Sequence, residues 1–168
     1  MTVADRSNVG EILKNLEELE SLSVQIGILG KSGSDMLMIG GVHEFGCSIP
    51  VTDKMRGFFA YNFGVHLRKD TKVIKIPERS YIRTSFDSKQ GEISAEGADL
   101  IGMVVEGQMS ARHFYEMLGQ TCVQAIQDFI TSNAVSPANT ALTIANKGSS
   151  SPLVDTGRLI GSISYEVK

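Results

Sequence analysis

The strongest constraint on the fold is a long amphipathic pattern in the second half of the chain. Behind Ser110, a residue type that caps helices, apolar residues recur at helical spacing at Phe114, Met117, Leu118, Cys122, Ala125, Ile126, Phe129 and Ile130. The stretch from about Gly91 to Ser132 is predicted to be mostly helical, with a break near Gly107. A stripe of this length indicates one long helix with a core packed along one face.

The N-terminal part predicts a shorter helix followed by a strand. Residues 8–11 have the form of a capping box, and helical spacing follows at Val9, Ile12, Leu13, Leu16 and Leu19. Residues 23–28 then alternate with period two, which is typical of a strand. A loop over 31–34 leads into a short apolar segment, which Gly46 is expected to end as a helix C-cap.

The middle of the chain predicts an aromatic helix and a second strand. Thr52 or Asp53 is expected to cap the helix. Its apolar face is expected to form the aromatic centre of the core, with Met55, Phe58, Phe59, Phe63 and Leu67. Residues 71–76 predict a strand, which Pro77 ends because proline cannot donate a hydrogen bond to a ladder.

The C-terminal part predicts short elements. Residues 133–137 end the long helix, a short helix is expected over about 137–146, and 148–152 form a flexible connection. A helical turn near 156–161 and a last strand over 162–167 follow.

Together these patterns predict an α+β fold, with a small mainly antiparallel sheet of three or four strands packed against several helices, one of them long. A chain of 168 residues has the length of one structural domain, 1–168. Within it, residues 1–22 contain the N-terminal helix and 133–152 form a loop-rich connection.

Composition narrows the class of protein. A net charge of −3 argues against wrapping DNA or RNA, because affinity for nucleic acid comes mainly from neutralising phosphates. Cys47 and Cys122 belong to no metal or redox spacing and are read as reduced. No apolar run reaches the ~20 residues of a membrane span, and the first residues lack a signal-peptide core. The protein is expected to fold in a cytoplasm and to have no membrane partner.

Gly30-Lys31-Ser32 partly copies a phosphate-binding loop. Such a loop needs four residues between its first glycine and the Gly-Lys pair, and that position is Gln25. We also expect no helix N-terminus close behind the motif to meet phosphates. A strand-to-loop exit is therefore favoured over nucleotide binding.

Asp155-Thr156-Gly157 copies the signature of aspartic proteases. A homodimeric aspartic protease is the alternative function, since that chemistry needs two carboxylates sharing a proton. Only eleven residues follow Gly157, however, which leaves little chain for a substrate-covering flap. The favoured interpretation is that Asp155 caps the helical turn behind it.

No other motif predicts catalysis. His43, His66 and His113 stand on separate segments, without the spacing of a metal site. We therefore predict no enzyme activity, no cofactor and no metal. Basic residues do gather in the middle of the chain and are expected to form a protein contact surface, comprising Arg56, Lys69, Lys72, Lys75, Arg79 and Arg83.

Several segments taken together resemble phage neck and tail-completion proteins, of the lambda minor tail protein Z type and the Mu-like virion morphogenesis type. They are 42–46, 49–50, 52–59, 76–83, 147–148, 152–159 and 162–165, and the resemblance spans roughly residues 20 to 168. Members often carry Ala-Arg-Pro-Phe where this chain has Glu78-Arg79-Ser80-Tyr81.

The resemblance implies a structural virion protein at the head–tail joint: a neck, tail-completion or tail-terminator protein of a tailed phage, a prophage or a tail-like bacteriocin. It implies a non-enzymatic ring, typically a homohexamer in that family, assembled in the host bacterial cytoplasm. Its partners would be further copies of itself, the head connector, and tail tube or terminator proteins. DNA would only pass through the lumen.

The candidate assembly-interface residues come from these segments. We expect Pro77 to stiffen the corner at 76–79, and the arginines behind it to bond a neighbour's carboxylates. The candidates are His43, Glu44, Phe45, Arg56, Arg79, Tyr81, Arg83, Asp155, Thr156 and Arg158.

Overall fold

The computed structural model describes residues 9–132, 134–147, 151–154 and 156–168. In chain order the elements are α1 (Val9–Ser21), β1 (Val24–Ile28), η1 (Gly30–Ser32), α2 (Ser34–Phe45), β2 (Cys47–Pro50), α3 (Asp53–Phe63), β3 (Val73–Ile76), α4 (Tyr81–Val105), α5 (Ala111–Thr131), α6 (Ala141–Lys147), α7 (Arg158–Gly161) and β4 (Ile163–Val167). The fold is α+β with one especially long helix, as predicted.

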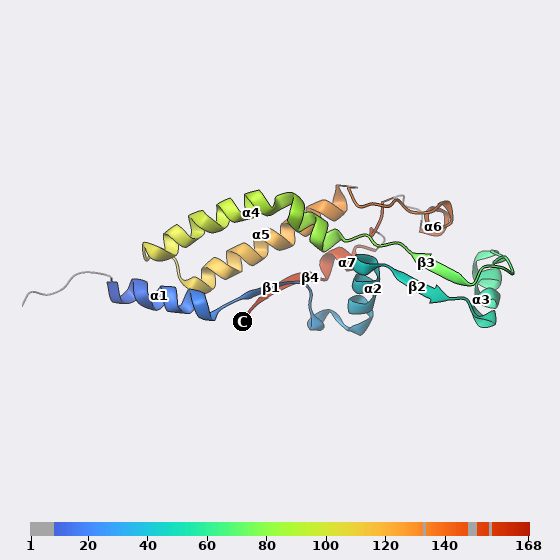
Figure 1. The fold of residues 1–168 in the computed structure, drawn as a ribbon, viewed down its shortest axis with the longest axis horizontal. Helices are drawn as coiled ribbons and strands as arrows, with labels where there is room; N and C mark the ends of the chain where they lie inside the picture. Colours follow the sequence, from blue (N-terminus) through green and yellow to red (C-terminus); the bar gives the residue numbers. More distant parts are fainter. Residues whose placement is uncertain (1–8, 133, 148–150, 155) are drawn as a thin grey trace, which may run out of the picture.

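The molecule is elongated and consists of a body and an arm (Figure 1). In the body, α4 and α5 form an antiparallel helical hairpin, and the β1–β4 pair lies against α5. We define the arm as residues 47–76, which comprise β2, α3 and β3. Its two strands lead away from the body and carry α3 at their far end, whereas α1 lies at the opposite end of the molecule.

The strands pair differently from the single sheet that was expected. All four are antiparallel, but they form two separate two-stranded sheets. In the body, Val24 lies opposite Val167 and Ile28 opposite Ile163. In the arm, Cys47 pairs with Ile76, two residues from the end of α2. Period-two alternation indicates a strand but not its partner, so the split could not be read from the pattern.

The long helical region is two helices, and the first begins earlier than predicted. The break near Gly107 is confirmed: α4 ends at Val105, and Gly107 has the positive φ of 73° that favours glycine. Ser110 caps α5 as predicted, because its hydroxyl accepts a hydrogen bond from the His113 amide at 3.2 Å. The start of α4, however, is Tyr81 rather than about Gly91.

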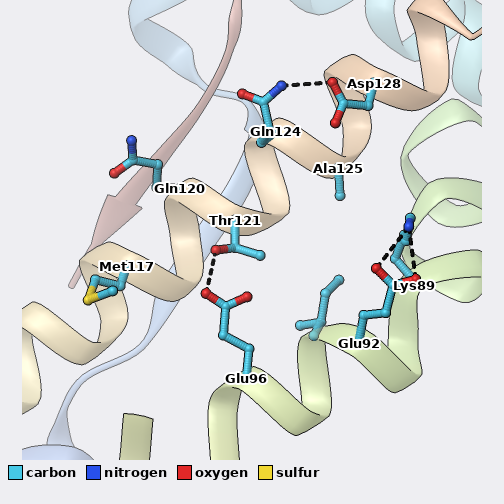
Figure 2. Close-up of a pocket in the computed structure, with 10 residues that line it drawn as sticks. Lys89, Glu92, Glu96, Met117, Gln120, Thr121, Gln124, Ala125 and Asp128 are labelled. Carbon is cyan, nitrogen blue, oxygen red and sulfur yellow. Dashed lines mark hydrogen bonds and ion pairs between the residues drawn. The ribbon is translucent and has the colours of Figure 1, made fainter. Parts of the chain in front are cut away.

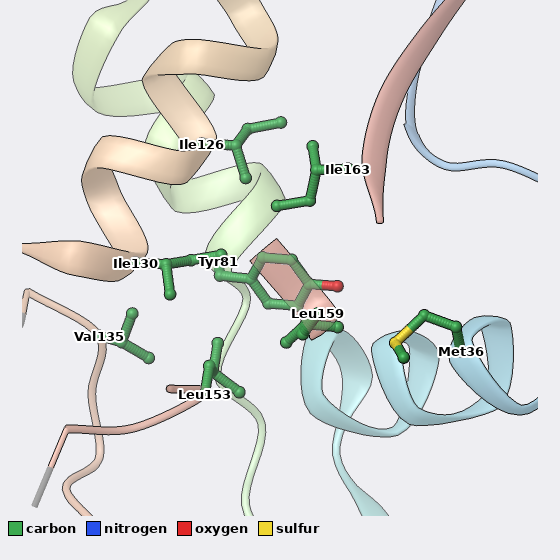
Figure 3. Packing of buried hydrophobic residues seen from close by; sticks show 8 residues of the cluster. All are labelled: Met36, Tyr81, Ile126, Ile130, Val135, Leu153, Leu159 and Ile163. Carbon is green, nitrogen blue, oxygen red and sulfur yellow. The ribbon is translucent and has the colours of Figure 1, made fainter. Parts of the chain in front are cut away.

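The main core lies where α4 and α5 meet α2, α7 and β4. Its buried residues come from all five elements and from the loops beside them (Figure 3): Met36, Tyr81, Ile126, Ile130, Val135, Leu153, Leu159 and Ile163. A second cluster, nearer the α4–α5 turn, contains Leu100, Val104 and Phe114, with Leu19 of α1 packed against it. The predicted stripe on α5 supplies residues to both clusters.

The prediction that the α3 aromatics form the centre of the core is wrong. No residue of α3 is buried, and its three phenylalanine rings contact one another, with ring centroids 5.6 to 6.0 Å apart. An amphipathic pattern shows that a face requires cover, but not that the same subunit covers it.

At Gly119, α5 packs directly against the β1–β4 pair. A Cβ atom added there would lie 2.6 Å from Cδ2 of Tyr165 and 3.0 Å from Cγ2 of Val24. A methyl group would therefore force the strands away from the helix.

Replacing Gly119 with alanine should lower the free energy of unfolding by about 1–3 kcal/mol, the usual cost of overpacking. The matched control is Gly91→Ala in α4, where an added Cβ meets nothing within 4 Å. That variant should gain roughly 0.5–1 kcal/mol from helix propensity. Urea denaturation of both variants measures the contrast, and equal effects would contradict the packing described here.

Candidate assembly surface

Most of the predicted interface residues meet at one place, the joint between arm and body. We define the joint as the end of α2 (His43, Glu44, Phe45), the segment 78–80 and the first turn of α4. The chain passes through it twice, on its way into the arm and on its way out. Gly46 ends α2 as predicted; an added Cβ there would lie 2.9 Å from the Glu78 amide nitrogen, so only glycine fits.

The carboxylate of Glu44 is the centre of the joint. Its side chain is only 5% exposed. It accepts hydrogen bonds from the amides of Ile82 at 2.9 Å and Arg83 at 3.2 Å, and from Nε of Arg83 at 3.0 Å. The amides at the start of a helix have no partners within the helix and carry a partial positive charge. Glu44 therefore caps α4 from another helix, while Ser80 at the cap position makes no side-chain cap.

Arg83 ties three parts of the joint together. Its Nη2 donates to the Glu44 carbonyl oxygen at 3.1 Å and to Oε1 of Glu78 at 2.6 Å. Its guanidinium also lies 5.2 Å from the centre of the Phe45 ring, within cation–π range. These bonds join the last residues of α2, the segment leaving β3, and the first turn of α4.

Arg79 joins the arm to the loop behind α5. Its amide donates to the His43 carbonyl oxygen at 2.8 Å, and its Nε donates to the Pro137 carbonyl oxygen at 2.9 Å. Nη2 also reaches Oδ1 of Asn139 at 3.3 Å. Burial lowers the pKa of the Arg79 guanidinium through desolvation, and these acceptors compensate for the water it has lost.

Tyr81 is fully buried in the main core (Figure 3). Its hydroxyl oxygen lies 3.5 Å from the carbonyl oxygen of Gly40. Burial, with a smaller contribution from the nearby Glu44 carboxylate, raises the pKa of the Tyr81 phenol well above its ordinary value.

These positions correct part of the interface prediction. Glu44, Arg79 and Tyr81 are buried within the subunit, and Arg83, with a side chain 53% exposed, bonds carboxylates of its own chain. Arg56 is likewise engaged inside the arm, where it donates to the carbonyl oxygens of residues 67, 68 and 71. These arginines hold parts of the same subunit together. A guanidinium group can donate several hydrogen bonds within one chain just as it can between two chains.

The other candidates stay predictions. Phe45 is 68% exposed, Thr156 and Arg158 are exposed, and His43 is half-buried. Asp155 lies outside the described residues, so its predicted capping role stays untested. The residue at the cap position of α7 is Gly157.

The arm carries an exposed aromatic surface that the interface prediction missed. We define the arm-tip patch as Phe58, Tyr61 and Phe63 of α3, of which Tyr61 is 91% and Phe58 54% exposed. The sequence pattern did point to this patch, because Phe58 and Phe63 belong to the apolar helix face that was predicted to lie in the core. Large aromatic side chains of this kind supply much of the binding energy in protein interfaces.

A groove of about 460 Å³ between α4 and α5 is the other surface feature missed (Figure 2). Its lining includes the carboxylates of Glu92, Glu96 and Asp128 and one cation, Lys89. Glu96 accepts from the Thr121 hydroxyl at 2.9 Å, Asp128 from the Gln124 amide at 2.7 Å, and Lys89 pairs with Glu92 at 2.8 Å. These intrachain bonds bridge or brace the two helices.

The phosphate-loop hypothesis receives one correction. A helix does begin close behind Gly30-Lys31-Ser32, because α2 starts at Ser34. The motif itself forms the 3₁₀ turn η1, and Nζ of Lys31 pairs with Oε1 of Glu166 at 3.1 Å. The lysine thus has a partner on β4.

The described part of the chain contains neither a metal-binding cluster nor a membrane-spanning helix. Within it, no three His, Cys, Asp or Glu side chains are placed to hold a metal ion. No helix there is both long and apolar enough to cross a membrane. The chain also matches no protein-family model, no curated protein and no solved structure.

Replacing Glu44 with alanine should lower the free energy of unfolding by about 2 kcal/mol, because two amides of α4 and the Nε of Arg83 lose their acceptor. The matched control is Glu78→Ala, which removes the other carboxylate that Arg83 bonds. That ion pair is half exposed on both sides, so its loss should cost less than about 1 kcal/mol. Chemical denaturation compares the two, and equal losses would show that Glu44 is no cap.

The buried phenol predicts a pH dependence in the alkaline range. The pKa of Tyr81 is raised in the folded state, so its contribution to stability is complete below the unfolded value of about 10 and is lost as pH rises further. In a titration to alkaline pH followed by the ultraviolet absorbance of tyrosinate, one component should appear at higher pH than the rest and should coincide with unfolding. Tyr81→Phe should remove this component and Tyr61→Phe should keep it; a late component that survives in Tyr81→Phe would contradict the assignment.

Proposed function

We propose that this chain is a non-enzymatic structural subunit of the head–tail joint of a tailed phage or a phage-tail-like particle, where copies of it form a ring. The observation that carries the proposal is the arm, which projects from the body and bears the arm-tip patch. A projecting segment that exposes large aromatic side chains is typical of a protein whose surface is completed by another subunit.

The joint supplies a physical reason for the resemblance to phage neck and tail-completion proteins. Two of the segments that carry it, 42–46 and 76–83, meet in the joint, where Glu44, Arg79 and Arg83 form its bonds. A third segment, 152–159, contributes Leu153 and Leu159 to the core next to it. The shared residues are therefore those that set the direction of the arm, which is the property a ring subunit has to preserve.

The proposed partners follow from the same resemblance. The ring would contact the head connector on one side and tail tube or terminator proteins on the other, in the neck of the virion. A net charge of −3 is compatible with DNA passing through the lumen without strong attachment.

Deleting the gene from the phage or prophage that encodes the chain should leave heads and tails that do not join, or tails of abnormal length. Expression of the wild-type protein in trans should restore normal particles. Electron microscopy of purified particles measures both outcomes, and mass spectrometry of the same particles should detect the chain.

A complementation control separates assembly from simple presence of the protein. Gly91→Ala, an exposed helical change outside the arm, should complement as well as wild type. Particles of normal form that assemble without the chain, and that do not contain it in the wild type, would rule out the proposal.

A further inference from the structure

The two ends of the molecule carry opposite charge. The arm has six Lys or Arg residues against two Asp residues, a net charge of +4. At the other end, α1 has four Glu residues against one Lys, a net charge of −3. Figure 1 places these two elements at opposite ends of the long axis.

Much of the basic charge of the arm faces solvent. Arg56 is engaged by backbone carbonyls and Arg68 pairs with Asp70 at 3.2 Å. The four lysines of the arm are exposed at Lys54, Lys69, Lys72 and Lys75. They are available to an acidic surface of another molecule.

Both charged ends also carry uncovered apolar side chains. On the arm these are the arm-tip patch. On α1 they form a stripe at spacing i, i+4 and i+7, comprising Val9, Leu13 and Leu16, with Leu13 55% exposed. Helical geometry places Glu20 on the same face and Glu17 beside it. Leu19, on the neighbouring face of α1, packs against the second cluster of the body, whereas Val9, Leu13 and Leu16 stay exposed.

We infer that the arm of one copy docks on the α1 stripe of the next copy, with aromatic side chains against aliphatic ones and lysines beside glutamates. This inference rests on the proposed function and names the contact that would build the ring. Its two surfaces match in both apolar character and charge, which is the condition for a specific contact.

The charge distribution also favours a contact between two different surfaces over a contact between two copies of the same surface. Two arms facing each other would bring like charges together, and so would two α1 helices. Of the contacts that these two ends can make with each other, the arm-to-α1 contact is the one that joins opposite charges. Such a contact uses two different surfaces of each subunit, so it repeats from copy to copy until a ring closes. The joint holds the arm in one direction and thereby reduces the ordering cost of each contact.

The test exchanges the charges of the two surfaces in the full-length protein. The arm variant is Lys69→Glu with Lys72→Glu, and the α1 variant is Glu17→Lys with Glu20→Lys. Analytical ultracentrifugation should find that wild type self-associates and that each variant is weakened by roughly tenfold or more, as expected for the loss of charge pairs at an interface. Circular dichroism of each variant verifies that it is folded.

Mixing the two variants gives the sharpest result. The α1 variant keeps an intact arm and the arm variant keeps an intact α1, and the two exchanged surfaces match each other in charge, so a mixture should regain higher oligomers in which the two variants alternate. A chain carrying both exchanges should regain higher oligomers. The matched control is Glu92→Lys with Asp128→Lys in the α4–α5 groove, which changes the charge equally and should leave association unchanged.

Four results would overturn the inference. They are a wild type that stays monomeric at its highest soluble concentration, a variant mixture that associates no better than either variant alone, loss of association in the groove control, and an arm variant that associates normally but loses binding to duplex DNA. The particle experiment separates this contact from the proposed function. A monomeric chain still found at the head–tail joint rejects the contact alone, whereas an associating chain missing from particles rejects the function alone.

Discussion

The architecture depends on one buried carboxylate. Glu44 lies in the last turn of α2, but its carboxylate accepts hydrogen bonds from amides in the first turn of α4. The whole arm lies between these two helices in the sequence. Burying an unpaired carboxylate is costly, so Glu44 remains buried only while α4 and Arg83 are in place. Conversely, α4 begins at Tyr81 because the Glu44 carboxylate accepts hydrogen bonds from the amides of its first turn. The two ends of the arm are fastened to each other through this carboxylate, and Arg79 extends the fastening to the loop behind α5.

The joint fastens only the two ends of the arm, so the rest of the arm depends on its own contacts. The two-stranded β2–β3 ribbon packs little against the body, and isolated ribbons of this kind are marginal in water. Arg56 compensates by binding three carbonyl groups of the turn that follows α3. The three phenylalanines of α3 pack against each other, and Phe58, Tyr61 and Phe63 stay exposed although burial would stabilise them. This arrangement agrees with our proposal that another subunit covers these side chains, and the opposite charge of α1 is the reason for proposing that helix as the covering surface.

The arginine residues show how one motif serves either of two purposes. From the sequence, arginines behind a stiff proline corner favour contacts with a neighbouring chain. In the folded chain, Arg79 and Arg83 find their acceptors among residues that the sequence places far away, such as Pro137 and Glu44. Two of the segments that carry the proposed resemblance to phage proteins meet in the joint, whereas the contact surfaces that we propose lie on α3 and α1.

Local physics let the sequence alone determine a large part of the fold. The stripe on α5, the Ser110 and Thr52 caps, the glycine at the end of α2, and the strands β1 and β4 all follow from spacing and from side chains that bond within a few residues. Only the tertiary structure decided where α4 begins, how the strands pair, and whether the α3 aromatics are covered. A helix cap supplied by another helix leaves no pattern in the neighbouring sequence. Period-two alternation does not identify the strand that pairs with it. An apolar helix face does not show whether its own subunit or another molecule covers it.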